Sequence, residues 1–227
     1  MIDRLGPYLL GPNDAEENGI YTGDARVLAK AIPDESVDLI FCDPIYQNID
    51  DYRWLAEMAA RVLKPDRACL VFCGIGYLPA TMQALTDGGL TYRWTCASVI
   101  WGRNNRGEYG IYNKWACLLW FDNGRSKPSG WAFDVHQTTV SRRSGNGHGW
   151  QKHPDAVREY LRILPGLTID VFCGGGTVPA VCKMLGRKYL AFEIDPATAN
   201  LARQRVRDTQ PPLFVQSAEQ LELVAAQ

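Results

Sequence analysis

The sequence predicts an α/β protein with a doubly wound, mostly parallel sheet, because segments rich in β-formers alternate with segments of helical periodicity along the 227 residues. Two predicted strands end in distinctive motifs, Asp43-Pro44-Ile45-Tyr46 and Phe172-Cys173-Gly174-Gly175-Gly176-Thr177. Ligands of open α/β sheets bind outside the carboxyl ends of the strands. If the two strands are neighbours, both motifs face one cleft, where one can hold a cofactor and the other a substrate.

The first part of the chain is expected to contain three strands and three helices. Residues 37–42 give a strong strand signal, and the apolar residues of 52–63 follow the 3,4-spacing of an amphipathic helix that Lys64-Pro65 stops. The predicted strands are 19–22, 37–42 and 68–72, and the predicted helices are 25–32, 52–63 and 78–86.

The middle of the chain is not predicted to alternate between strands and helices. Residues 92–101 and 114–121 have the composition of an antiparallel strand pair, joined by a loop rich in Arg, Asn and Gly. Residues 122–152 have no clear period, so we expect a loop or small insertion there.

The last part returns to alternating strands and helices. Pro154 and Pro196 stand at expected helix starts, where proline is tolerated. Helices are predicted at 154–164, 177–185 and 196–207, and strands at 167–172 and 188–194.

Composition argues against several kinds of protein. No apolar run reaches the roughly 20 residues of a membrane-spanning helix, and Asp3, Asp14, Glu16 and Glu17 lead us to expect no secretory signal. The seven cysteines include no Cys-x-x-Cys pair, and the three histidines are scattered. These features favour reduced, buried thiols in a cytoplasmic protein and argue against a metal site.

Charge is unevenly distributed, although the net charge is only −1. Residues 101–152 carry eight Lys or Arg against three acids, including Arg103, Arg106, Arg142 and Arg143. The segment can be a solvated loop that happens to be basic, or a basic strip that faces a polyanion. Interleaved Gly, Asn and aromatic residues favour a nucleic-acid clamp in which the four arginines contact DNA.

The glycine motif also has two interpretations. It can be a plain strand-to-helix turn, or a place where backbone and a helix N-terminus approach a ligand. Glu193, at the end of the next predicted strand, favours a ligand because an acid there commonly accepts hydrogen bonds from ribose hydroxyls. Glu193 could instead cap the helix that begins at Pro196, as Asp195 is expected to do.

These motifs resemble those of a known family. Phe172-x-Gly174-x-Gly176-Thr177 is similar to the S-adenosylmethionine motif of class I methyltransferases, and Asp43-Pro44-Ile45-Tyr46 resembles the "DPPY" motif of enzymes that methylate exocyclic amino groups of DNA bases. The catalytic motif comes first, which is the order of the β group of DNA amino-methyltransferases. The resemblance extends from Gly19 to Arg207 and implies a Rossmann-like methyltransferase sheet.

The resemblance assigns the cofactor site residue by residue. It implies Asp24 at the adenine of S-adenosylmethionine, Glu193 at its ribose and Asp170 at its amino-acid end. The full set of expected cofactor contacts is Asp24, Lys152, Pro154, Asp170, Phe172, Gly174, Gly176, Thr177 and Glu193. A nicotinamide or flavin is the competing cofactor, but the Phe-x-Gly-x-Gly-Thr form disfavours it.

The first motif suits chemistry at an amino group. Asp43 and the carbonyl of Pro44 can accept hydrogen bonds from both N–H groups of an exocyclic amine, and Tyr46 can stack on a base flipped out of the duplex. The plain alternative is an ordinary Asp-Pro turn after a strand. Asp rather than Ser at position 43 favours adenine N6 over cytosine N4.

Three positions depart from the family pattern. Ile45 stands where the family has a second proline, Val171 where a proline commonly precedes the Phe, and Lys114-Trp115 where many relatives have His-Glu. None of these changes removes a predicted catalytic group, although Ile45 loosens the loop.

The sequence therefore predicts a site-specific, S-adenosylmethionine-dependent adenine-N6 methyltransferase of double-stranded DNA, in the cytoplasm of a bacterial or phage-infected cell. One domain, 1–227, would comprise a catalytic half (19–121), a target-recognition insertion (122–152) and a cofactor half (153–208). Open alternatives are a cytosine-N4 enzyme, an inactive cofactor-binding DNA-binding protein, and a methyltransferase of RNA or small molecules. A homodimer and a role in restriction-modification also remain open.

Overall fold

The computed structural model describes residues 19–101, 105–106, 110–139 and 154–210. In chain order the elements are β1 (Gly19–Thr22), α1 (Ala25–Leu28), η1 (Ala29–Ala31), β2 (Val37–Cys42), α2 (Ile49–Val62), β3 (Leu63–Cys73), η2 (Ile75–Tyr77), α3 (Leu78–Asp87), β4 (Thr91–Trp101), β5 (Asn105–Arg106), β6 (Tyr112–Asn113), β7 (Trp115–Asn123), β8 (Val135–Thr139), α4 (Pro154–Ile163), β9 (Thr168–Asp170), α5 (Thr177–Met184), β10 (Tyr189–Glu193) and α6 (Pro196–Asp208).

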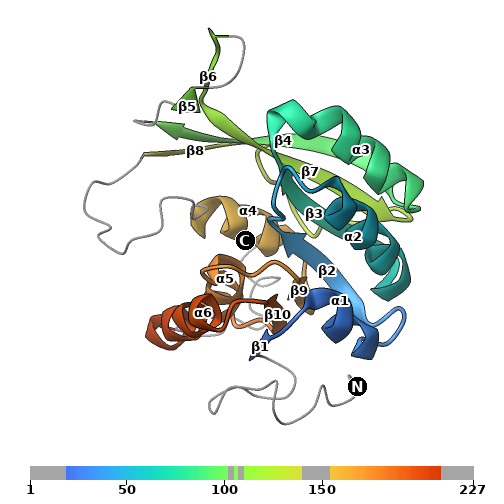
Figure 1. Cartoon of the computed structure of the whole chain (residues 1–227), viewed down its shortest axis with the longest axis vertical. Coiled ribbons are helices and arrows are strands. Elements are labelled where there is room, and N and C mark those ends of the chain that lie inside the picture. The colour runs from blue at the N-terminus through green and yellow to red at the C-terminus, as the bar shows by residue number, and fades with distance from the viewer. Residues whose placement is uncertain (1–18, 102–104, 107–109, 140–153, 211–227) are drawn as a thin grey trace, which may run out of the picture.

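The core of the fold is an eight-stranded sheet with the order β1-β10-β9-β2-β3-β7-β4-β8 (Figure 1). Five of the seven pairings in this sheet are parallel. The other two involve β7, which runs antiparallel to both β3 and β4. The predicted doubly wound, mostly parallel α/β sheet with an antiparallel strand pair is confirmed.

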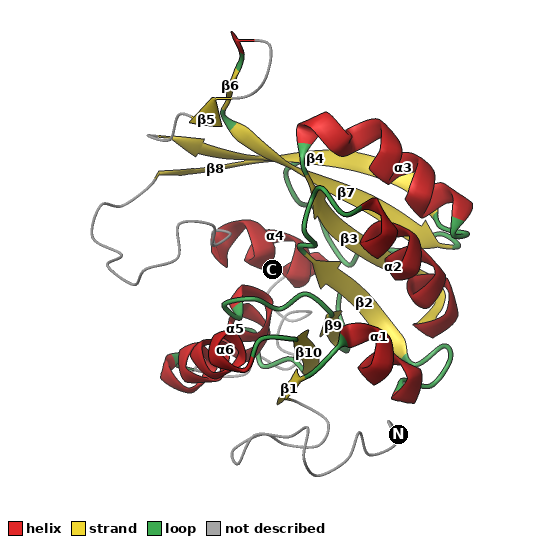
Figure 2. Ribbon diagram, viewed as in Figure 1, coloured by secondary structure: helices red, strands yellow, loops and turns green. Residues whose placement is uncertain are grey.

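Helices cover both faces of this sheet (Figure 2). One apolar cluster joins the sheet to α1, α2 and α3, with Leu28, Leu55 and Leu85 fully or almost fully buried. A second cluster joins the opposite face to α4, α5 and α6 through Val157 and Val181, among others. The two buried faces explain why β2 is apolar at nearly every position.

The strand β8 lies inside the segment 122–152, for which a loop was predicted. It pairs in parallel with β4 at the edge of the sheet, and the Ala97 N–H donates to the Asp134 carbonyl at 2.7 Å where the pairing begins. Val135-His136-Gln137-Thr138-Thr139 has too little apolar pattern to predict a strand. Backbone pairing with β4 specifies it instead, so the expectation of a loop does not hold for residues 135–139.

Smaller differences concern element boundaries. The two short strands β5 and β6 pair within the predicted Arg/Asn/Gly loop. The helix predicted at 25–32 is split into α1 and η1, and the strand predicted at 167–172 is confined to β9. β9 is short because the chain turns away after Asp170, whose carboxylate accepts a hydrogen bond from the Phe172 N–H at 3.1 Å.

Candidate active site

The tips of four parallel strands bring most of the predicted site residues to one edge of the sheet. β2 pairs with β9, with Ile40 opposite Ile169, so Asp43 and the glycine motif both follow the carboxyl ends of adjacent strands. β9 pairs with β10, and β10 with β1, where Thr22 lies opposite Glu193. The two motifs therefore lie at the same edge of the sheet, which is the edge where open α/β sheets form their ligand crevice.

The glycine motif contains two glycines that are needed for different reasons. Gly176 has φ +73°, and a Cβ there would lie 2.9 Å from Cβ of Ala202 on α6. Gly174 has φ +50°, but a Cβ there would meet nothing within 4 Å. Gly176 thus permits close packing of loop and helix, whereas Gly174 borders open space.

Glu193 fixes the shape of this loop. Its Oε2 accepts a hydrogen bond from the Gly174 N–H at 2.9 Å, and its Oε1 accepts one from the Asp195 N–H at 2.9 Å. The cap of α6 is Asp195, whose Oδ2 accepts from the Thr198 N–H at 2.7 Å. Glu193 is therefore a brace between the glycine loop and the tip of β10, and a carboxylate has lone pairs left for further donors.

Asp24 lies at the same edge, beside the tip of β10. The Gly23 N–H donates to the Glu193 carbonyl at 2.9 Å. Asp24 caps α1, because its Oδ1 accepts from the Arg26 N–H at 2.8 Å. The predicted adenine and ribose contacts thus lie on neighbouring strand ends.

Three acidic residues gather at adjacent strand tips on this edge. Asp170 is buried, and this burial raises the pKa of its carboxyl well above the ordinary value; the negative charges of Asp43 and Glu193 raise this pKa further. Three carboxylates of three adjacent strand tips therefore influence one another, and a cation would relieve their repulsion.

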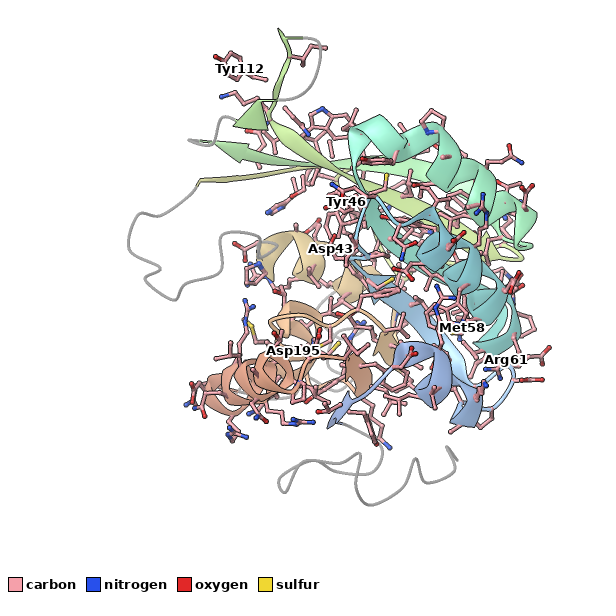
Figure 3. All side chains as sticks on the ribbon, in the orientation of Figure 1. Asp43, Tyr46, Met58, Arg61, Tyr112 and Asp195 are labelled. Atoms are coloured by element: carbon pink, nitrogen blue, oxygen red, sulfur yellow. The ribbon has the colours of Figure 1, made fainter. Side chains whose placement is uncertain are left out.

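Asp43 and Tyr46 lie next to each other after β2 (Figure 3). Burial raises the pKa of the Tyr46 hydroxyl, and the nearby charge of Asp43 and a hydrogen bond to its carboxylate raise it further. Pro44 between them is buried, whereas the Ile45 side chain is 68% exposed. The Tyr46 hydroxyl therefore stays protonated and donates to Asp43.

Two residues that sequence reasoning missed hold these loops. A Cβ at Gly74, just after β3, would lie 2.9 Å from Cδ2 of Tyr46, so the ring packs on the Gly74 backbone. Arg205 of α6 donates from Nη1 to the Gly175 carbonyl at 3.2 Å and to Oγ1 of Thr177 at 2.8 Å. Gly74 lies two residues after the predicted strand 68–72, which was a usable signal, whereas nothing in the sequence marks Arg205.

An aromatic pair connects the glycine motif with α2. The rings of Trp54 and Phe172 meet edge to face with centroids 6.0 Å apart, and the Arg26 guanidinium lies 5.5 Å from the Trp54 ring centroid. Phe172, a predicted cofactor residue, is thus partly covered from the α2 side.

Several predicted residues cannot be placed. Arg103, Arg142, Arg143 and Lys152 lie outside the described residues, and only the backbone of Arg106, in β5, is described. Pro154 is the first residue of α4.

All seven cysteines are buried, as predicted. The described part of the chain holds no group of three or more His, Cys, Asp or Glu side chains that could bind a metal ion. Among the described residues, no helix is long and apolar enough to cross a membrane.

The fold is that of the class I methyltransferases. The chain superposes on the crystal structure of M1.HpyAVI in complex with SAM with a TM-score of 0.72 and 20% identity, covering 83% of this chain and 98% of that one. It superposes on the PvuII DNA methyltransferase, a cytosine-N4-specific enzyme, with a TM-score of 0.74 and 16% identity, covering 94% and 93% of the two chains.

The sequence relatives are type II methyltransferases. The chain is 24% identical over 260 residues to M2.LlaDCHI of Lactococcus lactis subsp. cremoris, covering 88% of this chain and 94% of that protein. It is 26% identical over 261 residues to M.HinfI of Haemophilus influenzae, covering 86% and 69%. No family model matches the chain. The resemblance inferred from the two motifs is confirmed by these relatives.

Proposed function

We propose that this chain transfers a methyl group from S-adenosylmethionine to an exocyclic amino group in double-stranded DNA, with adenine N6 as the preferred acceptor. The observation that carries the proposal is the parallel pairing of β2 with β9, which sets Asp43-Pro44-Ile45-Tyr46 beside the glycine motif. The type II methyltransferases among its relatives and the SAM complex among its structural neighbours support the same conclusion.

The described residues fit this cofactor. S-adenosylmethionine carries positive charge on its sulfonium and its ammonium group, and the crevice presents the carboxylates of Asp43, Asp170 and Glu193. Gly174 borders open space. Glu193 and Asp24 would hold the adenosine part, and Asp170 with the glycine loop would hold the amino-acid part. When bound, the cofactor supplies an electrophilic methyl group.

Asp43, Pro44 and Tyr46 would prepare the acceptor. The lone pair of an exocyclic amine is delocalised into the base, so the nitrogen is a poor nucleophile. When a carboxylate and a carbonyl accept hydrogen bonds from the two N–H groups of the amine, the lone pair of the nitrogen becomes available in one direction. The Tyr46 hydroxyl donates a hydrogen bond to Asp43, which fixes the carboxylate, and the Tyr46 ring can stack on the flipped base.

The choice of base is the finer part of the proposal. Asp at position 43 favours adenine, by resemblance to the family. The cytosine-N4-specific PvuII enzyme has the same fold, so the fold does not discriminate between the two bases. Cytosine N4 is therefore the second candidate.

DNA contacts are proposed for the basic segment. Arg103, Arg106, Arg142 and Arg143 would contact phosphates or bases, and phosphate contacts would make binding weaken with salt.

The test is transfer of a labelled methyl group to duplex DNA, RNA and free nucleosides, followed by long-read sequencing of modified bases in DNA from cells that express the chain. We expect N6-methyladenine at one recurring sequence. Asp43→Ala should abolish turnover while cofactor binding is retained. Turnover by Asp43→Ala, or labelling of RNA or nucleosides in preference to DNA, would overturn the proposal.

A further inference from the structure

We propose that Arg26, Asp51 and Asn48 form a loop clamp that positions the catalytic loop 43–48 relative to the cofactor side of the crevice. These three are positioning residues rather than catalytic residues. The inference rests on the proposed function, because it assigns how the catalytic loop of that same site is held.

A continuous chain of hydrogen bonds carries the inference. On the cofactor side, the Arg26 N–H donates to Oδ1 of Asp24 at 2.8 Å. Nη2 of Arg26 donates to Oδ1 of Asp51 at 2.8 Å, and Nδ2 of Asn48 donates to Oδ2 of Asp51 at 2.9 Å. The Asp51 carboxylate therefore joins α1 to the residue that ends the catalytic loop.

Asn48 transmits this contact to the loop backbone. Its N–H donates to the Ile45 carbonyl at 3.0 Å, which closes a turn between Pro44 and α2. Asn48 is the N-cap of α2, yet its side chain makes no capping hydrogen bond and is directed to Asp51 instead. An Asn at this position ordinarily caps its own helix, so the geometry points to a different task.

The loop needs such a contact because of Ile45. Where the resembled family has a second, rigid proline, this chain has an isoleucine whose side chain is 68% exposed and so provides little packing. A proline restricts φ and stiffens a loop. The clamp compensates by fixing the backbone on the far side of Tyr46.

The clamp also reaches the glycine motif. The Arg26 guanidinium lies 5.5 Å from the Trp54 ring centroid, and the Trp54 ring meets that of Phe172 at 6.0 Å. Arg26 thus contacts side chains that belong to both halves of the crevice, and the Asp51 side chain is only 14% exposed.

A neighbouring ion pair provides a matched control. Arg53 and Asp50 pair at 2.6 Å in the first turn of the same helix, with side chains 64% and 74% exposed. Asp50 and Asp51 are both acids in the first turn of α2, where a negative charge interacts favourably with the helix dipole. Only Asp51 is connected to the catalytic loop and to α1.

The experiment compares Asp51→Ala and Arg26→Met with Asp50→Ala and Arg53→Met in the full chain. At saturating cofactor and DNA we expect kcat to fall about 10- to 100-fold in the two clamp variants, because misplacement of reacting groups has effects of this size. The control variants should stay within about 2-fold of the wild type. Arg26→Lys, which keeps the charge, should recover part of the loss.

Two further measurements separate positioning from folding. Because the Arg26 side chain is 47% exposed and exposed ion pairs contribute little to stability, the melting temperature of Arg26→Met should change by less than about 3 °C. Hydrogen exchange of a peptide that spans residues 42–54, measured without any substrate, should accelerate in Asp51→Ala and not in Asp50→Ala.

Equal losses of kcat in clamp and control variants, or unchanged hydrogen exchange in Asp51→Ala, would overturn the inference. Failure of the proposed function looks different: the wild type itself would then label no DNA, while the hydrogen-exchange comparison would still report whether the clamp holds the loop.

Discussion

The two loops that form the crevice are held in different ways. The glycine loop after β9 is held through its backbone: Glu193 accepts from the Gly174 N–H, and Arg205 donates to the Gly175 carbonyl. The catalytic loop after β2 is held largely through side chains, with the Tyr46 ring packed on Gly74 and its hydroxyl bonded to Asp43.

This difference follows from what each loop would bind. A backbone-held glycine loop can approach a small ligand closely and present N–H groups, with no side chain in the way. A loop that orients an acceptor must fix one carboxylate and one carbonyl in a given direction, which packing against a rigid neighbour achieves. Substitutions that add one methyl group to each loop should therefore act differently.

The largest expected effect is on the catalytic loop. Gly74→Ala would place a Cβ 2.9 Å from Cδ2 and 3.2 Å from Cβ of Tyr46, so the ring must move. Since Gly74 has φ −77°, the backbone itself accepts alanine. We expect kcat for methyl transfer to fall about 100-fold, because the Tyr46–Asp43 contact is displaced, with cofactor affinity unchanged.

Gly76→Ala is the matched control for this prediction. A Cβ there would meet nothing within 4 Å, two residues further along the same turn. Its kcat should equal that of the wild type in the same labelled-methyl assay. If both alanine variants were fully active, the packing of Tyr46 on Gly74 would have no role in turnover.

The next effect concerns the glycine loop and separates folding from ligand binding. Gly176→Ala combines φ +73° with a Cβ 2.9 Å from Cβ of Ala202, so we expect about 2–4 kcal/mol of lost unfolding free energy. Gly174→Ala has φ +50° and open space, which predicts a loss of only about 1 kcal/mol. Its methyl group would enter the space assigned to the cofactor, so calorimetry should show weakened S-adenosylmethionine binding. Equal stability of the two variants in urea would contradict this division.

Most of the fold could be predicted because its signals are local. β2 and α6 have strong apolar patterns or clear start signals, and their observed bounds lie within one residue of the prediction. β8 could not be predicted, because an edge strand of mixed composition is specified by its backbone pairing with β4. No pattern within residues 135–139 reveals that partner.

The residues of the candidate site also divide into those that have a local sequence signal and those that have none. Residues within the two motifs, such as Asp43 and Gly174, could be found from the sequence because each motif consists of consecutive residues. Arg205 and Asp51 could not, because each acts through a contact with a residue distant in sequence: Thr177 for Arg205 and Arg26 for Asp51. Contacts of this kind depend on the sheet order, which brings distant strand tips together.

The smallest expected effect concerns Asp170, the buried acid that ends β9 and lies near both Asp43 of the catalytic loop and Glu193, which holds the glycine loop. Burial and the charges of Asp43 and Glu193 raise the pKa of Asp170, so its negative charge is disfavoured in the folded protein, and stability is lost as the pH rises above the unfolded-state pKa of about 4. Asp170→Asn keeps an acceptor for the Phe172 N–H and removes this charge, so its melting temperature should exceed that of the wild type at pH 7. The advantage should shrink as the pH falls towards 4, because the carboxyl is then protonated in the unfolded chain as well as in the folded protein.

Asp170→Asn should have opposite effects on stability and on cofactor binding: it should stabilise the fold but weaken the binding of S-adenosylmethionine. A cationic ligand favours the ionised carboxylate, so wild-type affinity for S-adenosylmethionine should rise with pH until Asp170 is ionised in the free protein and then level off. Asp170→Asn should bind more weakly and lose this pH dependence. Calorimetry in two buffers of different ionisation enthalpy would reveal the proton that the wild type releases on binding. A stabilised Asp170→Asn that binds the cofactor as tightly as the wild type, at every pH, would remove Asp170 from the cofactor site and leave it only a buried acid beside the catalytic loop.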